Sequence, residues 1–215
     1  MSSPLNNFFS KIYCINLDRR KDRWEEVTEE FKKWDIEGVT RYPAIDGNSL
    51  PDLYAGMTTL PKSAIGLILT NIKILEEAKK QNLDSILIME DDVVFHPSFS
   101  EIENKLSRVP RNWHCLYFGG NHNLHKGEKP PAMIDEDICR IHKTFTTHCV
   151  AIKSGMYKVI LDELKSGVPS KPLDVIYTDL QRRFNFYCFY PAVALQRAGY
   201  SDIQNKVMDY EKWIK

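Results

Sequence analysis

Three adjacent acids, Glu90, Asp91 and Asp92, stand directly after the apolar run 86–89 and carry the strongest chemical signal in the sequence. Carboxylates this close repel one another, and a buried strand behind them offers no water. A divalent cation would relieve that repulsion, because Mg²⁺ and Mn²⁺ prefer oxygen ligands and share them with substrate phosphates. If the backbone stays extended, Glu90 and Asp92 project to one side and Asp91 to the other. The alternative is a solvated acidic turn that ends a strand.

A second polar cluster follows the first apolar run of the chain. Residues 16–20 (NLDRR) place an asparagine and two arginines at the end of a predicted strand. Arginine offers a fork of donors suited to phosphate, and asparagine can bind a base edge. The alternative is an ordinary strand-to-helix turn with solvated charges. Neither a GxGxxG motif nor a P-loop is present in the sequence, which disfavours a dinucleotide-binding dehydrogenase.

The elements that would position these clusters alternate along the chain. Short apolar runs predict strands, and apolar residues three or four apart, such as Val27 and Phe31, predict helices. Residues 48–62 and 121–137 lack such patterns and are predicted loops. Alternating strands and helices predict an α/β sandwich with a mainly parallel central sheet, formed by residues 1–215 as one domain. The predicted strands are 11–17, 39–42, 86–89, 115–118, 149–152 and 186–190, and the predicted helices after the first are 63–80, 99–106, 156–164 and 174–184.

Charge and composition exclude several classes of protein. There are 29 basic and 29 acidic residues, so no global field favours nucleic acid or an anionic membrane as partner. No apolar run reaches the roughly 18 residues that span a bilayer, and the polar residues 1–10 do not resemble a signal peptide. Scattered cysteines without CxxC spacing predict reduced core thiols. We therefore expect a cytoplasmic protein, bacterial or viral rather than of the secretory pathway. The cysteines are Cys14, Cys115, Cys139, Cys149 and Cys188.

Several motifs in a fixed order carry a resemblance to a known family. The sequence resembles glycosyltransferase family 25, which includes lipooligosaccharide galactosyltransferases and collagen hydroxylysine galactosyltransferases. The resemblance extends from about residue 11 to residue 203. The motifs are IYCINLDRRKDRW (12–24), YPAIDG (42–47), ILIMEDDVV (86–94), WHCLYFGG (113–120), PLD (172–174) and QRAGYSDI (196–203).

This resemblance implies a GT-A fold and an inverting transfer of a hexose, galactose or glucose, from a UDP-sugar. The acceptor would be a hydroxyl of a glycan or of a collagen-like protein. Mn²⁺ or Mg²⁺ would be bound by Asp92 and Glu90, with Asp91 shared between the metal and the donor ribose. The resemblance further implies donor-side residues Asn16, Leu17, Arg20, Arg23, Ala44, Asp46 and Gly47, and acceptor-side residues Gln196, Ser201 and Asp202.

The sequence departs from the family at two places. Members usually have a Gly-Cys-x-x-Ser-His run before the acidic strand, whereas this chain has Thr70 and Asn71 at the last two positions. Many GT-A enzymes also supply a histidine metal ligand near the C-terminus, and no histidine follows His148 here. A third protein ligand is therefore absent or comes from His122 or His148. The alternative for both histidines is a hydrogen-bonded structural side chain.

An inverting transfer also needs a base for the acceptor hydroxyl. Asp174 fits by position, because it follows Pro172 and begins a predicted helix. The structural interpretation of Asp174 is an N-cap, which predicts the same residue type. Two further functions remain open: a metal-dependent phosphoesterase, and a sugar-binding relative without activity. The sequence does not specify the sugar, the acceptor or the oligomeric state.

Overall fold

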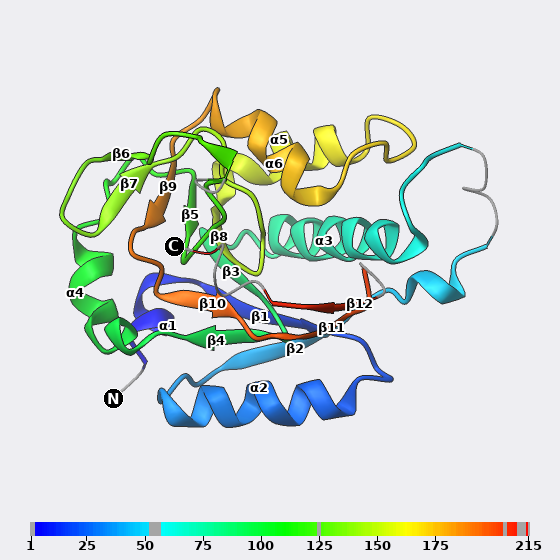
Figure 1. Cartoon of the computed structure of the whole chain (residues 1–215), viewed down its shortest axis with the longest axis horizontal. Coiled ribbons are helices and arrows are strands. Elements are labelled where there is room, and N and C mark those ends of the chain that lie inside the picture. Colours follow the sequence, from blue (N-terminus) through cyan, green and yellow to red (C-terminus); the bar gives the residue numbers. More distant parts are fainter. Residues whose placement is uncertain (1–2, 52–56, 124–125, 204–205, 210–213, 215) are drawn as a thin grey trace.

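The computed structural model describes residues 3–51, 57–123, 126–203, 206–209 and 214. Its main element is an eight-stranded sheet with the strand order β2-β1-β3-β8-β5-β9-β7-β6 (Figure 1). The strands are β1 (Lys11–Asn16), β2 (Val39–Pro43), β3 (Ser85–Glu90), β5 (Cys115–Tyr117), β6 (Ala132–Met133), β7 (Ile138–Arg140), β8 (Cys149–Lys153) and β9 (Phe186–Phe189).

The sheet is mixed, although most of its strands run in one direction. β1 is parallel to both β2 and β3, and β5 is parallel to β9. β8 lies between β3 and β5 and is antiparallel to both, and β7 is antiparallel to β9. The prediction of an α/β fold with a mainly parallel central sheet is confirmed, with β8 and β7 as the reversed strands.

Helices cover both faces of this sheet. In Figure 1, α3, α5 and α6 lie above it and α2 lies below it. The helices are α1 (Pro4–Phe8), α2 (Lys21–Lys33), α3 (Lys62–Lys80), α4 (Ile102–Ser107), α5 (Ser154–Leu164) and α6 (Leu173–Gln181), with short 3₁₀ turns η1 (Gly47–Ser49) and η3 (Pro97–Glu101).

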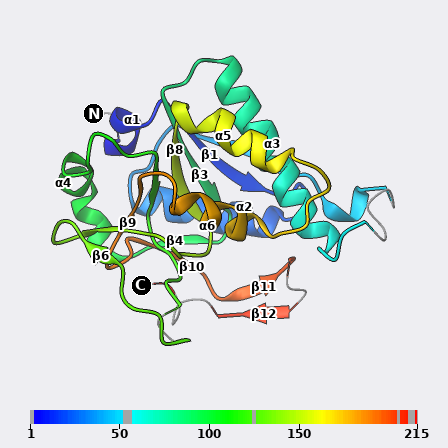
Figure 2. The same ribbon diagram turned by 90° about the horizontal axis from the view of Figure 1, so that it is seen from above.

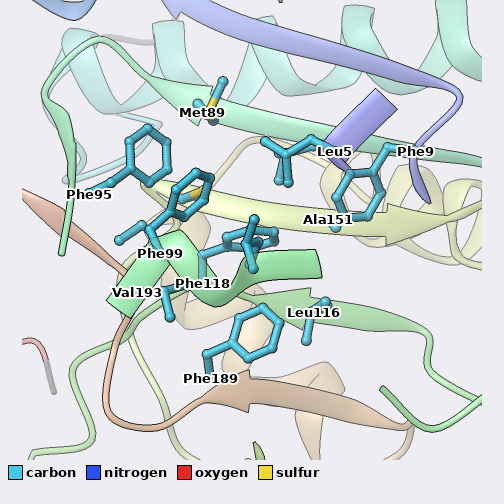
Figure 3. Packing of buried hydrophobic residues seen from close by; sticks show 14 of the residues in the cluster. Leu5, Phe9, Met89, Phe95, Phe99, Leu116, Phe118, Ala151, Phe189 and Val193 are labelled. Carbon is cyan, nitrogen blue, oxygen red and sulfur yellow. The ribbon is translucent and has the colours of Figure 1, made fainter. Parts of the chain in front are cut away.

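Alternation along the strands divides the core into two clusters. In β1, Ile12 and Cys14 pack in the cluster on the α2 side, whereas Tyr13 and Ile15 pack in the cluster under α3, α5 and α6. Because both faces are buried, the strand has a continuous apolar run without a polar face. Figure 3 shows part of the first cluster, where Phe118 and other aromatic side chains fill the space between the sheet and its flanking elements.

Two short ribbons lie outside the main sheet. β4 (Val93–Phe95) pairs with β10 (Ala194–Gln196), and β11 (Gly199–Ser201) pairs with β12 (Lys206–Met208). Figure 2 shows the β11–β12 ribbon to one side of the main sheet. The predicted loop 48–62 lies between η1 and α3, with residues 52–56 outside the described part. The predicted loop 121–137 contains β6, and its residues 124–125 also lie outside that part.

No helix within the described ranges is both long and apolar enough to cross a bilayer.

Candidate active site

A cleft of about 990 Å³ opens at the carboxyl ends of β1, β2 and β3. These three strands are mutually parallel neighbours, so the residues that follow them meet at one edge of the sheet. The cleft brings together almost all the residues predicted from the sequence, across 187 positions of chain. They are Asn16, Leu17, Arg23, Ala44, Asp46, Gly47, Glu90, Asp91, Asp92, Asp174, Gln196, Ser201 and Asp202.

The acidic cluster is built on a turn rather than on an extended strand. β3 ends at Glu90, a turn contains Asp91 and Asp92, and β4 begins at Val93. The extended backbone on which the alternate projection of the acids depended is therefore not present, and Asp91 and Asp92 both approach Arg23 Nη1, at 2.7 Å and 3.5 Å. The backbone of the turn is held by Arg197, whose N–H donates to the Asp92 carbonyl over 2.8 Å.

Asp91 is the acid most firmly held by protein groups. One of its carboxylate oxygens accepts a 2.6 Å hydrogen bond from Asn16 Nδ2, and the other lies 2.7 Å from Arg23 Nη1. The Asn16 amide also donates to the Arg20 carbonyl and accepts from Arg41 Nε, so it is engaged within the protein and is only 1% exposed. Asn16 and Arg23 therefore fix the orientation of Asp91.

Asp92 and Glu90 are held more loosely than Asp91. The contacts from Arg23 and Gln196 to the Asp92 carboxylate are both 3.5 Å long, and Thr147 Oγ1 lies 3.4 Å from Glu90 Oε1. Such distances are weak for hydrogen bonds to an anion. The oxygens of these two acids thus keep coordination capacity toward the cleft, which fits a hard divalent cation.

The pKa values of the three acids also favour a bound cation. Burial and the charges of its two acidic neighbours raise the pKa of Glu90 to about 8. Burial also raises the pKa of Asp91 and of Asp92, although the nearby Arg23 guanidinium opposes both shifts. Arg197 opposes the shift of Asp92 as well, yet the two guanidinium groups do not offset the burial and mutual repulsion of the three acids, so the site is short of positive charge.

A second set of ion pairs also lines the cleft. Arg19 bridges two acids, with Nε 2.8 Å from Asp46 Oδ2 and Nη2 2.7 Å from Asp202 Oδ1. Arg20 Nη1 lies 2.7 Å from the other Asp202 oxygen and also pairs with Asp22. Among the described lining residues, the cleft includes Arg19 and not the predicted Arg20. The NLDRR run was the signal for Arg19, since both arginines follow the strand end.

The turn after β2 is held by helix α3. Ala44 N–H donates to the Asn16 carbonyl, and Ile45 N–H donates to Thr70 Oγ1 over 2.9 Å. A Cβ added to Gly66 would lie 2.4 Å from the Ile45 carbonyl oxygen, so only glycine permits this approach. Thr70, which stands where the family has its serine, therefore supports the predicted donor-side turn, a role that sequence reasoning missed.

Asn71, which replaces the family histidine, is buried in α3. It is 4% exposed and donates to the Leu67 carbonyl in its own helix. It does not belong to the described residues that line the cleft, whereas Leu67 does. The position of the missing family histidine thus lies one helical turn beyond the lining residue Leu67.

Asp174 lines the cleft from the first turn of α6. The N-cap of that helix is Pro172 and its first residue is Leu173, so the N-cap interpretation of Asp174 is wrong. Asp174 Oδ1 instead accepts from its neighbour Val175 N–H over 2.9 Å. A carboxylate is favourable there because of the positive end of the helix dipole. Burial nevertheless raises its pKa, against the hydrogen bonds from backbone N–H groups.

Neither candidate histidine belongs to the described lining of the cleft. His148 is fully buried, its Nε2 donates to the Ala194 carbonyl over 3.0 Å, and burial lowers its pKa to about 4. His122 Nδ1 lies 2.7 Å from Thr144 Oγ1. Both histidines have the hydrogen-bonded structural environment that the sequence left as an alternative.

Comparison with known proteins agrees with the motifs. Residues 9–147 match the family described as glycosyltransferase family 25 (LPS biosynthesis protein). The chain belongs to glycosyltransferase family 25. The matched region contains β1, the predicted donor-side turn and the acidic cluster of the family 25 chain, whereas Asp174 and the predicted acceptor-side residues lie beyond it.

Relatives in animals are longer than this chain. A "Glycosyltransferase 25 family member" of Drosophila melanogaster is 30% identical over 182 residues, which cover 76% of this chain and 28% of the relative. A protein of the same name from Anopheles gambiae is 30% identical over 138 residues, which cover 56% of this chain and 23% of that relative. The human "Procollagen galactosyltransferase 2" is 27% identical over 131 residues, which cover 52% of this chain and 21% of that relative. The chain thus spans less than a third of the length of these curated relatives.

Among solved structures, a glycosyltransferase involved in glycosylation of the major capsid of PBCV-1 aligns with a TM-score of 0.49 and 12% identity, covering 86% of this chain and 92% of that chain.

Proposed function

We propose that this family 25 chain is a metal-dependent, inverting hexosyltransferase, with residues 1–215 acting as one catalytic domain. It takes galactose or glucose from a UDP-sugar and transfers it to a hydroxyl of a glycan or a collagen-like protein. The observation that carries the proposal is the charge-deficient acidic turn at residues 90–92, which shares one cleft with the arginine-bearing strand end and the donor-side turn.

Asp92 and Glu90 would hold the Mn²⁺ or Mg²⁺, because their oxygens keep coordination capacity. When bound, the cation supplies positive charge against the diphosphate of the departing UDP. Asp91, fixed by Asn16 and Arg23, lies beside them and is suited to accept a hydrogen bond from the donor ribose. Arg19, which also lines the cleft, would contribute a fork of donors toward phosphate oxygens.

Asp174 would act as the base on the acceptor side. Burial raises the pKa of Asp174, and a carboxylate with a raised pKa is a stronger base than an exposed one. In the transfer, the proton of the acceptor hydroxyl passes to Asp174, the acceptor oxygen bonds to the anomeric carbon, and the bond to UDP breaks. Gln196, Ser201 and Asp202 would line the acceptor approach.

The relatives suggest which substrates to try first. The names of the matched mammalian proteins specify a galactosyltransferase that acts on procollagen. UDP-galactose is therefore the first donor, and a hydroxylysine peptide and simple glycosides are the first acceptors.

The test is metal-dependent release of UDP from a UDP-sugar. The purified chain is treated with EDTA, and UDP is measured by chromatography with and without added Mn²⁺, for UDP-galactose and UDP-glucose. We expect release only with metal, and its loss in Asp92→Asn. Asp162→Asn is the matched control, since Asp162 is an exposed acid on α5 that pairs with Lys158.

Three outcomes would contradict the proposal. Release at equal rates with and without metal rejects the metal dependence, and release of inorganic phosphate instead of UDP indicates a phosphoesterase. No turnover with any UDP-sugar, combined with sugar binding by calorimetry, indicates a binding protein. Parent activity in Asp92→Asn rejects the assignment of the metal site.

A further inference from the structure

We propose that His122, Cys139 and Cys188 form a second metal site, selective for zinc and distinct from the oxygen-lined cleft. These residues come from three separate segments of the chain, and each contributes one ligand atom to a cluster in which all three atoms lie within 4.8 Å of one another. All three side chains are buried, and none belongs to the described lining of the cleft.

Strand register brings the two sulfurs together. Cys139 of β7 and Cys188 of β9 are direct partners in an antiparallel pair, so both side chains leave the sheet on the same face. Their thiols donate to backbone carbonyls, 3.4 Å from Cys139 Sγ to the Cys188 carbonyl and 3.2 Å from Cys188 Sγ to the Phe189 carbonyl, and the two thiols are also hydrogen-bonded to each other. A thiol is a weak donor, so none of these contacts is strong. Such weak contacts are easily exchanged for metal–thiolate bonds.

The imidazole of His122 is already oriented as in a metal ligand. Its Nδ1 is bonded to Thr144 Oγ1 over 2.7 Å, and its ring packs edge-on against Tyr190 with centroids 5.4 Å apart. A ligating histidine usually has its second nitrogen held by a neighbouring oxygen, which fixes the ring and the tautomer. Nε2 is thus the nitrogen that would coordinate.

The donor set selects the metal. Zinc binds Cys sulfur at about 2.3 Å and His nitrogen at about 2.0 Å in a tetrahedron, which places neighbouring ligand atoms about 3.5–3.8 Å apart. The observed spacing, with its upper bound of 4.8 Å, needs side-chain shifts of about 1 Å. Two thiolates neutralise Zn²⁺, so the complex can be buried without net charge, and a small exogenous ligand such as water would take the fourth position. Mg²⁺ and Mn²⁺ prefer the all-oxygen set of the cleft instead.

The cluster is connected to a wall of the cleft. Thr144, which holds His122, also exchanges two hydrogen bonds with the side chain of Gln181, at 2.8 Å and 2.7 Å. Gln181 is the last residue of α6, the helix that carries Asp174 at its other end. Just beyond Thr144, residues 146 and 147 line the cleft. Zinc at this site would therefore stabilise the position of residues 144–147 and of α6 relative to the sheet.

The test uses the full chain, reduced, stripped of metal and titrated with Zn²⁺ or Co²⁺. We expect one tightly bound equivalent of zinc by mass spectrometry of the metal, and thiolate-to-Co²⁺ charge-transfer absorption with cobalt. Cys188→Ser and His122→Gln should lose both signals. Cys115→Ser is the matched control, since Cys115 is equally buried in the same cluster of the core but lies outside the site. Asp92→Asn should keep its zinc, which separates this site from the cleft.

Absence of both zinc and the cobalt band in the wild-type chain would overturn the proposal, and this measurement does not depend on the variants folding. Equal loss of metal in Cys115→Ser and Cys188→Ser would overturn it too. So would three rather than five titratable thiols in the unreduced, denatured chain, if peptide mapping of that chain assigns the one disulfide to Cys139 and Cys188.

Discussion

Three neighbouring acids of the cleft have the same chemistry and different surroundings. Asp91 is tied to Asn16 and Arg23 by contacts under 3 Å, whereas the contacts of Asp92 and Glu90 are 3.4 Å or longer. A carboxylate fixed by two donors serves to position its surroundings, and one with open lone pairs is able to bind a cation. The distinction between supporting and binding acids is thus made by contacts, which no spacing in the sequence encodes.

The Asp174 side chain accepts a hydrogen bond at the start of α6 and, in the proposed function, is also the base of the transfer. As a base its carboxylate must take the acceptor proton, so Asp174→Asn should lower transfer by roughly 10²–10⁴-fold. The donor dissociation constant, measured by calorimetry with UDP, should not change. The variant should remain folded, because the asparagine oxygen can still accept from Val175 N–H as Asp174 Oδ1 does.

Asp174→Ala is the control for the structural role, since it loses both the proton acceptor and the hydrogen bond at the start of α6. It should cost about 0.5–1 kcal/mol of stability by urea unfolding, whereas the asparagine variant should cost little. Near-parent transfer by Asp174→Asn would leave Asp174 with a structural role alone.

At the scale of elements, the β11–β12 ribbon is tied to the arginine-bearing end of β1. Asp202, in the turn of the ribbon, pairs with both Arg19 and Arg20, and Arg23 Nη2 donates to the Tyr200 carbonyl over 2.8 Å. Of these arginines, Arg19 and Arg23 line the cleft and are the groups that would face a diphosphate. A donor that binds Arg19 must therefore compete with Asp202 for the same guanidinium.

That competition predicts the effect of Asp202→Asn. Removing the carboxylate frees Nη2 of Arg19, whose Nε keeps its ion pair with Asp46, so the affinity for UDP should rise several-fold and its dependence on ionic strength should steepen. Calorimetric titration with UDP and Mn²⁺ at two salt concentrations measures both quantities. Asp22→Asn is the matched control, because Asp22 pairs with Arg20 alone and should leave UDP binding unchanged. Unchanged UDP affinity with weaker acceptor binding in Asp202→Asn would instead assign this acid to the acceptor.

The elements that sequence reasoning found and missed differ in length. The buried strands and long helices were predicted within a few residues, because continuous apolar runs such as that of β3 and the helical spacing of Val27 and Phe31 are strong signals. β4, β10, β11 and β12 have three residues each, too few to show a period. β10 and β11 contain Gln196 and Ser201, so the prediction that these residues lie on the acceptor side depended on the resemblance alone.

At the scale of the whole molecule, most of the candidate cleft was predictable because parallel strand ends must meet at one edge of a sheet. Asn16, Ala44 and Glu90 follow or end three such strands and were predicted on that basis or from the motifs. The ion pairs of Arg19 and the support by Thr70 were not predictable, since they depend on how a distant turn and a helix approach that edge.

The gathered carboxylates also set how stability depends on pH. The raised pKa of Glu90, about 8 against an ordinary 4.5, means that the native state holds a proton which the unfolded chain releases above pH 4.5. Its contribution is fully present below pH 4.5 and is lost as the pH rises toward 8. Buried His148 acts oppositely, because its pKa is lowered to about 4 from an ordinary 6.5, so its contribution is lost as the pH falls from 6.5 to 4.

From pH 4.5 to 6.5, Glu90 and His148 change the free energy of unfolding in opposite directions. Between pH 6.5 and 8, the contribution of Glu90 is the larger of the two. We therefore expect the EDTA-treated protein to lose unfolding free energy across this window, measured by urea denaturation at intervals of pH. Glu90→Gln should flatten the loss, because the neutral amide has no proton to release. Mn²⁺ should reduce or reverse it in the parent chain, since the cation binds the ionised carboxylates and stabilises the native state more as the pH rises. Equal slopes for the parent and Glu90→Gln without metal would show that the buried acid does not control stability in this range.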